Sequence, residues 1–196
     1  MRYLASSNPG SKESKRMNTK LEPGDIFATN GEGIPGWAVR NLLSPATDKF
    51  HYGILWFKFL DDWVVIESTA KTGLAIGLLN LYKDYEIYRA SCPKKLRHDA
   101  PYGILEYCKS MYDYLLVVKL FFGALIGIVR ILLREHRIRR LRAEDFPYAR
   151  NDALICTEVV QVAYLTVGVS IIDPEIVPLP NAFRQAELDG IITRIV

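Results

Sequence analysis

Two apolar stretches decide the fold of this chain: HYGILWFKF (residues 51–59) and WVVIES (residues 63–68). Both are rich in β-branched and aromatic residues, which is typical of strands. Because only Leu60, Asp61 and Asp62 separate them, they predict a β-hairpin. Further strands are expected at 26–28, after the turn Pro23-Gly24, and at 73–77 and 85–89, the last two continuing the hairpin as an antiparallel meander.

After residue 93 the apolar pattern changes to a helical period. Helices are expected at 37–43, 102–114 and 156–167, the last closed by Gly168, and a short strand or extension at 191–196. This pattern predicts an α+β domain over 21–196. An antiparallel sheet of about five strands packs on the helix that begins at Cys156, with a helical insertion at about 102–142. Residues 1–20, polar and basic, predict a flexible tail.

Composition excludes several classes of protein. With 49% hydrophobic and 24% charged residues, the chain can bury one good-sized core, so it is neither disordered nor collagen-like. Cys92, Cys108 and Cys156 show no CxxC spacing, which argues against a disulfide framework or a cysteine-built zinc site. The N-terminus lacks the apolar segment of a signal peptide, so we expect a cytoplasmic protein, with association to a membrane as an option.

The net charge of +3 is unevenly distributed. Residues 1–20 carry +4 and residues 130–142 carry +5, which leaves −6 on the rest of the chain. An acidic body repels phosphate, and the basic segment has no interleaved aromatic residues. Nucleic acid is therefore not the expected partner.

Cys156 is the candidate nucleophile because it stands at the expected start of a helix. Free amide groups and the helix dipole favour a thiolate there, and the amide of Cys156 could stabilise an oxyanion. The alternative is that Cys156 is a small buried apolar residue, which is the commoner role of a free cysteine.

His51 is the candidate base, because it opens a strand after a polar loop. His98 and His136 lie among basic residues, which disfavour an imidazolium ion. Glu67, on the neighbouring strand, could orient the imidazole. Strand alternation by itself favours the alternative, in which Glu67 faces solvent.

These residues carry a resemblance to a known family. Leu21-Glu-Pro-Gly-Asp-Ile, then His51-Tyr-Gly-Ile, then Val65-Ile-Glu-Ser, then Ile155-Cys-Thr-Glu resemble the circularly permuted branch of the NlpC-type papain-like cysteine peptidases. That branch includes YiiX-like proteins and relatives of lecithin retinol acyltransferase. The motifs occur in the family's order over residues 21–167.

The resemblance implies a papain-like fold, with Cys156 as nucleophile, His51 as general base, Glu67 as the residue that orients His51, and Asp25 as a structural residue. We therefore expect a Cys-His-Glu thiol hydrolase or acyltransferase. It would cleave an amide or ester bond through a thioester acyl-enzyme, without metal or organic cofactor. A cell-wall-type peptide and an acyl lipid are the competing substrates. The alternative is a catalytically silent binding or membrane-associated module on the same fold.

The apolar run 115–133 is close to the length of a membrane span, but a continuous span would separate His51 from Cys156. A buried helix, an element at the lipid interface and an oligomer contact remain open. A basic stripe follows, which could contact anionic headgroups or simply be solvated. The stripe consists of Arg130, Arg134, Arg137, Arg139, Arg140 and Arg142.

Overall fold

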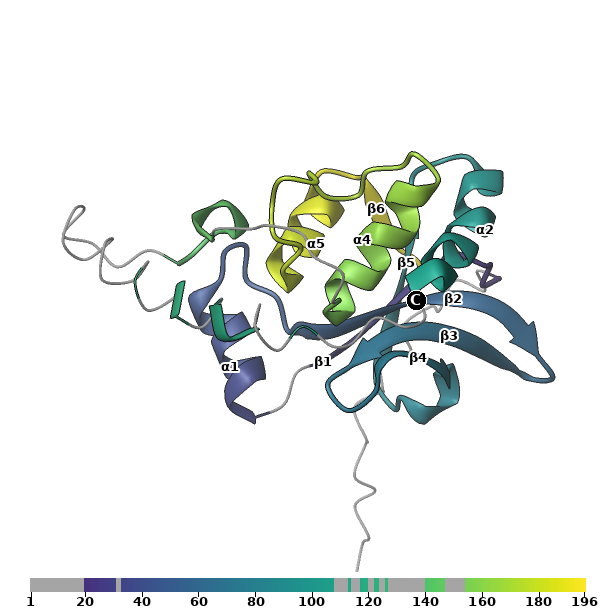
Figure 1. Ribbon diagram of the computed structural model, residues 1–196, viewed down its shortest axis with the longest axis horizontal. Coiled ribbons are helices and arrows are strands. Elements are labelled where there is room, and N and C mark those ends of the chain that lie inside the picture. The colour runs from purple at the N-terminus through teal and green to yellow at the C-terminus, as the bar shows by residue number, and fades with distance from the viewer. Residues whose placement is uncertain are drawn as a thin grey trace, which may run out of the picture.

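The architecture is α+β, with one antiparallel sheet and several helices (Figure 1). The computed structural model describes residues 20–30, 33–107, 113, 117–119, 122–123, 126, 140–146 and 154–196. The strands are β1 (Ile26–Asn30), β2 (Lys49–Phe59), β3 (Asp62–Thr69), β4 (Gly73–Leu78), β5 (Tyr85–Ala90) and β6 (Ile192–Arg194). The helices are α1 (Gly33–Leu42), α2 (Lys94–Gly103), α4 (Cys156–Thr166) and α5 (Pro180–Leu188), with 3-10 turns η1 (Leu79–Leu81), η2 (Ile104–Tyr107) and η3 (Ala143–Asp145).

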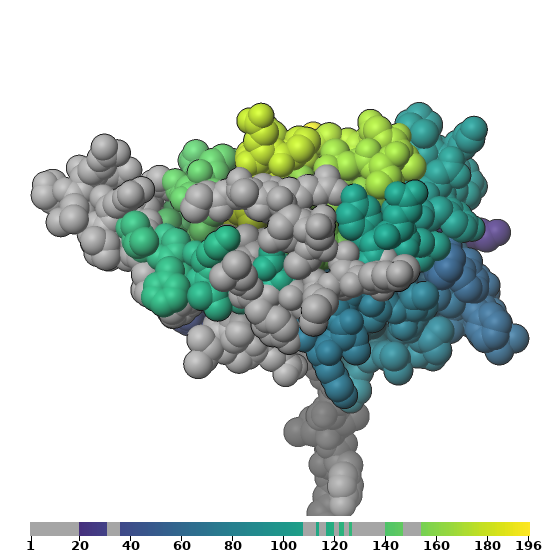
Figure 2. Space-filling view, in the orientation of Figure 1, coloured from purple at the N-terminus to yellow at the C-terminus, as the bar shows by residue number. Residues whose placement is uncertain are grey.

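The predicted hairpin is confirmed. Strands β2 and β3 are antiparallel, and Leu60 adopts a left-handed φ of 54° in the turn between them. Gly53 lies opposite Glu67 in this pair. In the space-filling view the hairpin and helix α2 form one end of the molecule (Figure 2).

The strand order, β4-β3-β2-β1-β5-β6, corrects the expected meander. Strand β5 does not follow β4 but pairs with β1, so that β1 lies between β2 and β5. A central position suits β1 because Ile26, Phe27 and Ala28 are fully buried on alternating faces. The segment expected to close the chain as a strand forms β6 beside β5 and is the sixth member of the sheet.

Helices α2, α4 and α5 cover one face of the sheet (Figure 1). Ile54 and Ile66 of the sheet pack there with Val159, Val160 and Phe183 of the helices. The opposite face carries a smaller apolar cluster formed by Phe27, Leu55, Val65, Leu79 and Ile87. Both faces of the central strands are therefore buried, which strand alternation alone does not predict.

The helices differ in part from expectation. Helix α4 is confirmed, and Gly168 ends it with a φ of +76°. The helix expected at 102–114 begins earlier, at Lys94, and becomes the 3-10 turn η2 at Ile104. Helix α1 begins before the expected Trp37, and α5 was not expected. Pro180 occupies the first turn of α5, where no amide hydrogen is needed.

The predicted insertion and tail fall mostly outside the described residues. This holds for residues 1–19, for much of 102–142 and for Arg130, Arg134, Arg137 and Arg139 of the basic stripe. Its other members, Arg140 and Arg142, are exposed. Leu141 contacts the end of α1, because its amide donates to the carbonyl of Leu42 at 2.7 Å. Among the helices of the described residues, none has the length and apolar character of a membrane span.

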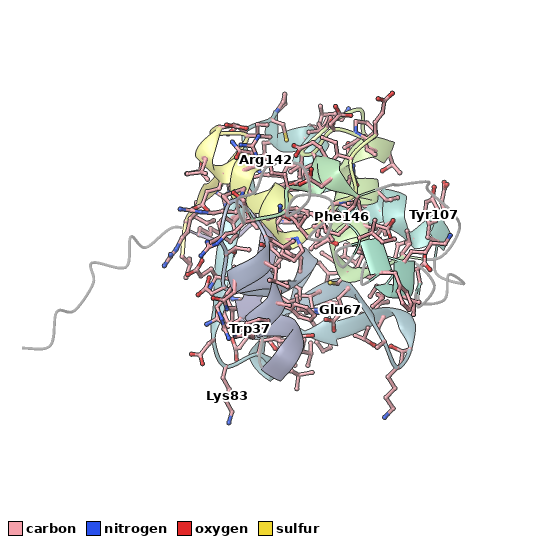
Figure 3. All side chains as sticks on the ribbon, turned by 90° about the vertical axis from the view of Figure 1, so that its left-hand side faces the viewer. Trp37, Glu67, Lys83, Tyr107, Arg142 and Phe146 are labelled. Carbon is pink, nitrogen blue, oxygen red and sulfur yellow. The ribbon has the colours of Figure 1, made fainter. Side chains whose placement is uncertain are left out.

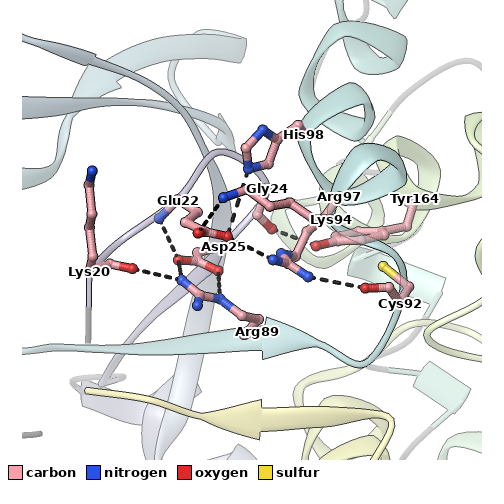
Figure 4. Close-up of polar contacts among 10 residues, drawn as sticks. All are labelled: Lys20, Glu22, Gly24, Asp25, Arg89, Cys92, Lys94, Arg97, His98 and Tyr164. Carbon is pink, nitrogen blue, oxygen red and sulfur yellow. Dashed lines mark hydrogen bonds and ion pairs between the residues drawn. The ribbon is translucent and has the colours of Figure 1, made fainter.

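The Pro23-Gly24-Asp25 turn is a buried junction (Figure 4). Gly24 has a φ of +85°, and a Cβ there would lie 2.0 Å from the carbonyl oxygen of Arg97. Asp25 is fully buried and accepts two hydrogen bonds from Arg89, both at 2.7 Å. The hydroxyl of Tyr164 donates to the carbonyl of Gly24 at 2.5 Å. The turn thus ties β1 to α2, β5 and α4, which agrees with the structural role expected of Asp25.

Candidate active site

Cys156 is the first residue of helix α4 and is 8% exposed. The helix begins there because the side chain of Glu158 accepts the amide hydrogen of Ile155, the N-cap residue, at 2.7 Å. The first amides of a helix have no partner within it, so the Cys156 end of α4 favours negative charge. The thiol lies 3.8 Å from the carbonyl oxygen of Phe50, which brings it to the beginning of strand β2.

Strand β3 holds the start of α4 against the sheet. Ser68, which is 1% exposed, donates its hydroxyl hydrogen to the carbonyl of Leu154 at 2.7 Å. Its neighbour in the strand, Glu67, points to the opposite face. Consecutive residues of one strand therefore position the segment before Cys156 and the carboxylate beside His51.

His51 lies on β2 at an irregularity of the sheet. The register between β1 and β2 shifts so that Thr29 faces His51 while Asn30 faces Lys49, which leaves Phe50 as an extra residue. Such bulges redirect side chains. Nε2 of His51 is hydrogen-bonded to Oε2 of Glu67, so Nδ1 is the nitrogen left for the thiol of Cys156.

Hydrogen bonds within the site favour the charged forms of His51 and Glu67. Burial by itself lowers the pKa of His51, but hydrogen bonds with Cys156 and Glu67 outweigh it and raise the pKa to about 10. Burial also disfavours the charged form of Glu67 and by itself raises the pKa of this carboxyl. The hydrogen bonds with His51 and Tyr82 outweigh that effect and keep the pKa of Glu67 below its usual value. His51 therefore carries a proton at neutral pH, and Glu67 is ionised.

Glu67 does not face solvent, so the alternative favoured by strand alternation is wrong. Its side chain is inside the protein, whereas Lys83 extends away from it (Figure 3). The side chain of Glu67 is buried because the apolar cluster on this face of the sheet covers β3 on the side opposite the helices. Glycine at position 77, on β4, leaves room for the carboxylate: a Cβ there would lie 3.2 Å from Oε1 of Glu67.

Tyr82 belongs to this site and was not expected from the sequence. Its hydroxyl donates to the same oxygen of Glu67 that His51 contacts. Its ring stacks with that of His51 at 6.0 Å between centroids and 23° between planes, and it lies 5.0 Å from the ring of Phe27. Burial raises the pKa of Tyr82 far above its usual value, as does the hydrogen bond with Glu67. Nothing in the spacing around Tyr82 marks it, because η1 brings it to Glu67 from beyond β4.

The remaining candidates lie elsewhere or outside the described residues. His98 is on α2, 3.8 Å from Glu22. Cys92 has a free thiol, and its backbone carbonyl accepts a hydrogen bond from Arg97 at 3.1 Å. Cys108 and His136 are outside the described residues. The described part of the chain contains no cluster of three or more His, Cys, Asp or Glu side chains suited to a metal ion. Chemically, the site combines the sulfur of Cys156 at a helix start, an imidazole that contacts it and a buried carboxylate, which is a set suited to nucleophilic attack and proton transfer.

Comparison of the chain with models of protein families, and with curated proteins, gave no match.

Proposed function

We propose that this protein is a Cys-His-Glu thiol hydrolase or acyltransferase acting on an amide or ester carbonyl. The observation that carries the proposal is the contact of one imidazole, His51, with both Cys156 and Glu67. A cysteine that served only as a core residue would have no need of a buried ion pair beside it. Buried charges are costly unless they are paired, and ionisable groups perturbed in this way cluster at functional sites.

The order of the three residues supports a permuted papain-like arrangement. His51 and Glu67 come from paired strands and precede Cys156, which begins the helix packed on that sheet. The family that the sequence resembles has the same order of residues. It also has a "PGD" turn, which corresponds to Pro23 to Asp25 in this chain, where Asp25 is buried and bound to Arg89.

In the proposed reaction the Cys156 sulfur attacks the carbonyl carbon as a thiolate, its proton being held by His51. The oxyanion that forms is stabilised by the amide of Cys156 at the start of α4. As the carbon–nitrogen or carbon–oxygen bond breaks, His51 gives its proton to the leaving group, and a thioester remains. Water or an acceptor nucleophile then gives its proton to His51, attacks the thioester and releases the thiolate.

The competing substrates are a peptide amide and an acyl lipid. The acyl-lipid option is motivated by the apolar run 115–133 and the basic stripe, which would lie beside an anionic surface. Paired substrates separate the two: a long-chain acyl ester in anionic vesicles, and a short soluble peptide amide. Thioester formation is followed as a mass increase on Cys156.

The decisive experiment is alkylation by iodoacetamide over a range of pH, mapped to each cysteine by mass spectrometry. We expect Cys156 to react at neutral pH faster than Cys92 by on the order of tenfold, because a cationic neighbour and a helix start favour the thiolate. The variant His51→Gln should remove most of this advantage. The matched variant His98→Gln changes a histidine of α2 and should leave it intact.

Two outcomes would contradict the proposal. One is that Cys156 reacts no faster than Cys92 and does not respond to His51→Gln. The other is that Cys156→Ala retains full activity on every substrate that the unchanged protein turns over. The second result, with a folded variant, would mean that the activity does not proceed through a thioester on Cys156. The first result, with no turnover of any substrate, would favour the silent binding module.

A further inference from the structure

Strand β4 is one edge of the sheet, and in the described part of the chain its only neighbouring strand is β3 (Figure 1). Successive residues of a strand direct their N–H and C=O groups to opposite sides. Half of the backbone groups of β4 therefore point away from β3. An edge of this kind can accept a further strand through main-chain hydrogen bonds.

β4 lacks the features that usually protect an exposed edge, which are lysines, prolines and bulges. Residues 73–81, GLAIGLLNL, contain no charged residue and no proline. The register between β3 and β4 is regular along the whole pair. The opposite edge, β6, is three residues long and carries Arg194. Of the two edges, β4 is the one suited to a further strand.

An apolar side chain is exposed in the middle of this edge. Ile76 is 62% exposed, although Ile66, which faces it across the strand pair, is fully buried beneath the helices. Leu74 and Leu78 lie on the same face of β4, two residues to either side, and are half-buried. A row of apolar side chains thus reaches the edge, and a strand with apolar residues at matching positions would cover Ile76.

The absence of charge favours a second copy of this chain as the partner. When two copies of one strand pair antiparallel about a two-fold axis, the residue at the axis faces itself. A charged residue there would face its own charge, which is destabilising. Residues 74–78 carry no charge, and the nearest lysines, Lys71 and Lys83, lie beyond the two ends of this segment.

We propose that β4 pairs antiparallel with β4 of a second copy, so that two sheets become one continuous sheet. Ile76 lies at the two-fold axis and contacts its own counterpart, and Leu74 faces Leu78 of the partner subunit. The assembly closes at two chains, because each copy uses its β4 edge for the other. This interface does not depend on the chemistry proposed for Cys156.

The test is sedimentation equilibrium of the full chain over a range of protein concentrations. We expect the mass to rise from that of one chain to that of two and no further. Ile76→Lys should raise the dissociation constant of the dimer on the order of tenfold or more, because two like charges then meet at the axis. The matched variant Leu188→Lys adds the same charge at an exposed leucine of α5 and should have little effect.

A charge-reversal pair tests the proposed register. Ile76→Lys and Ile76→Glu should each be monomeric alone, with circular dichroism checking that they fold. Mixed together they should associate as a pair, because opposite charges then meet at the axis. Cys156→Ala should form the same dimer as the unchanged protein, which separates this proposal from the proposed activity.

Four outcomes would overturn the proposal. The unchanged protein could remain monomeric at every concentration, or its mass could rise beyond two chains, as expected if β4 paired with β6 in an open-ended series. Ile76→Lys could dimerise as well as Leu188→Lys. Finally, the mixture of the two Ile76 variants could associate no better than either variant alone.

Discussion

Phe27 and Gly53 face each other across strands β1 and β2, and a Cβ on Gly53 would lie 2.3 Å from Cε1 of Phe27. The ring of Phe27 therefore occupies the space that a side chain at position 53 would need. From there it contacts the rings of His51 and Tyr82 at 6.0 and 5.0 Å between centroids. The glycine of the His-Tyr-Gly-Ile stretch thus has a physical reason: it admits the ring that packs behind the histidine.

Gly53→Ala should accordingly destabilise the protein by about 1–3 kcal/mol, the usual cost of overpacking a core. Urea unfolding followed by circular dichroism measures the change. Lys58→Ala, at an exposed position of the same strand, is the control and should be nearly neutral. A Gly53→Ala protein as stable as the control would show that Phe27 can move aside.

Asp25→Asn should be among the most destabilising polar substitutions. It removes the negative charge of the carboxylate, whose two oxygens accept both hydrogen bonds from Arg89 and the amide hydrogen of Glu22 (Figure 4). Breaking a buried ion pair by removing one partner costs roughly 3 kcal/mol or more. Thermal and urea unfolding measure the loss.

Glu187→Gln is the matched control for Asp25→Asn, since it breaks the more exposed pair with Arg184. It should cost about 0.5 kcal/mol or less. If the two variants lost similar stability, the junction at Asp25 would not have the structural role assigned to it.

The imidazole of His51 should titrate near pH 10, as seen in NMR titration of its ring protons. Because its folded-state pKa lies above the ordinary 6.5, its contribution to stability is complete below about pH 6.5 and is lost as the pH rises through about 10. Glu67→Gln and Cys156→Ala should each lower the pKa, because each removes a partner of the charged ring. The signal of His98 should respond to neither variant, and a His51 signal that titrates near its ordinary pKa would contradict the ion pair.

Tyr82→Phe should raise the pKa of Glu67, because it removes one of the two hydrogen bonds to Oε2 that favour the ionised carboxylate. Since the folded-state pKa of Glu67 is depressed, its contribution to stability is present above about pH 4.5 and is lost as the pH falls. That loss should begin at higher pH in the variant. The carboxyl carbon signal of Glu67 in NMR measures the shift.

Tyr88→Phe is the control for this titration, because the hydroxyl of Tyr88 donates to a different carboxylate, Glu86, at 2.6 Å. It should leave the titration of Glu67 unchanged. Equal shifts in both variants would mean that the tyrosine acts on Glu67 through general packing and not through its hydrogen bond.

The sequence alone predicted the α+β class, the β2–β3 hairpin and the helix that begins at Cys156. These features depend on local patterns, which are runs of β-branched residues, the turn at Leu60 and an amphipathic period closed by Gly168. It also singled out His51, Glu67 and Cys156 as candidates. The expected pairing of two strands linked Glu67 to His51, and the family resemblance implied a role for each of the three. The neighbours of β5, the early start of α2 and the existence of α5 were not predicted, because they depend on pairing and packing between distant segments.

What the sequence by itself determined, then, is which segments are strands and helices and which residues have suitable chemistry. Only the tertiary structure decided that Glu67 is buried, that Tyr82 shares its carboxylate with His51, and that Ser68 holds the segment before Cys156. The physical reason is that a strand places successive side chains on opposite faces, and the sequence does not reveal what covers each face. In this protein helices cover one face and an apolar cluster covers the other, so a carboxylate that alternation assigns to solvent becomes the buried partner of His51.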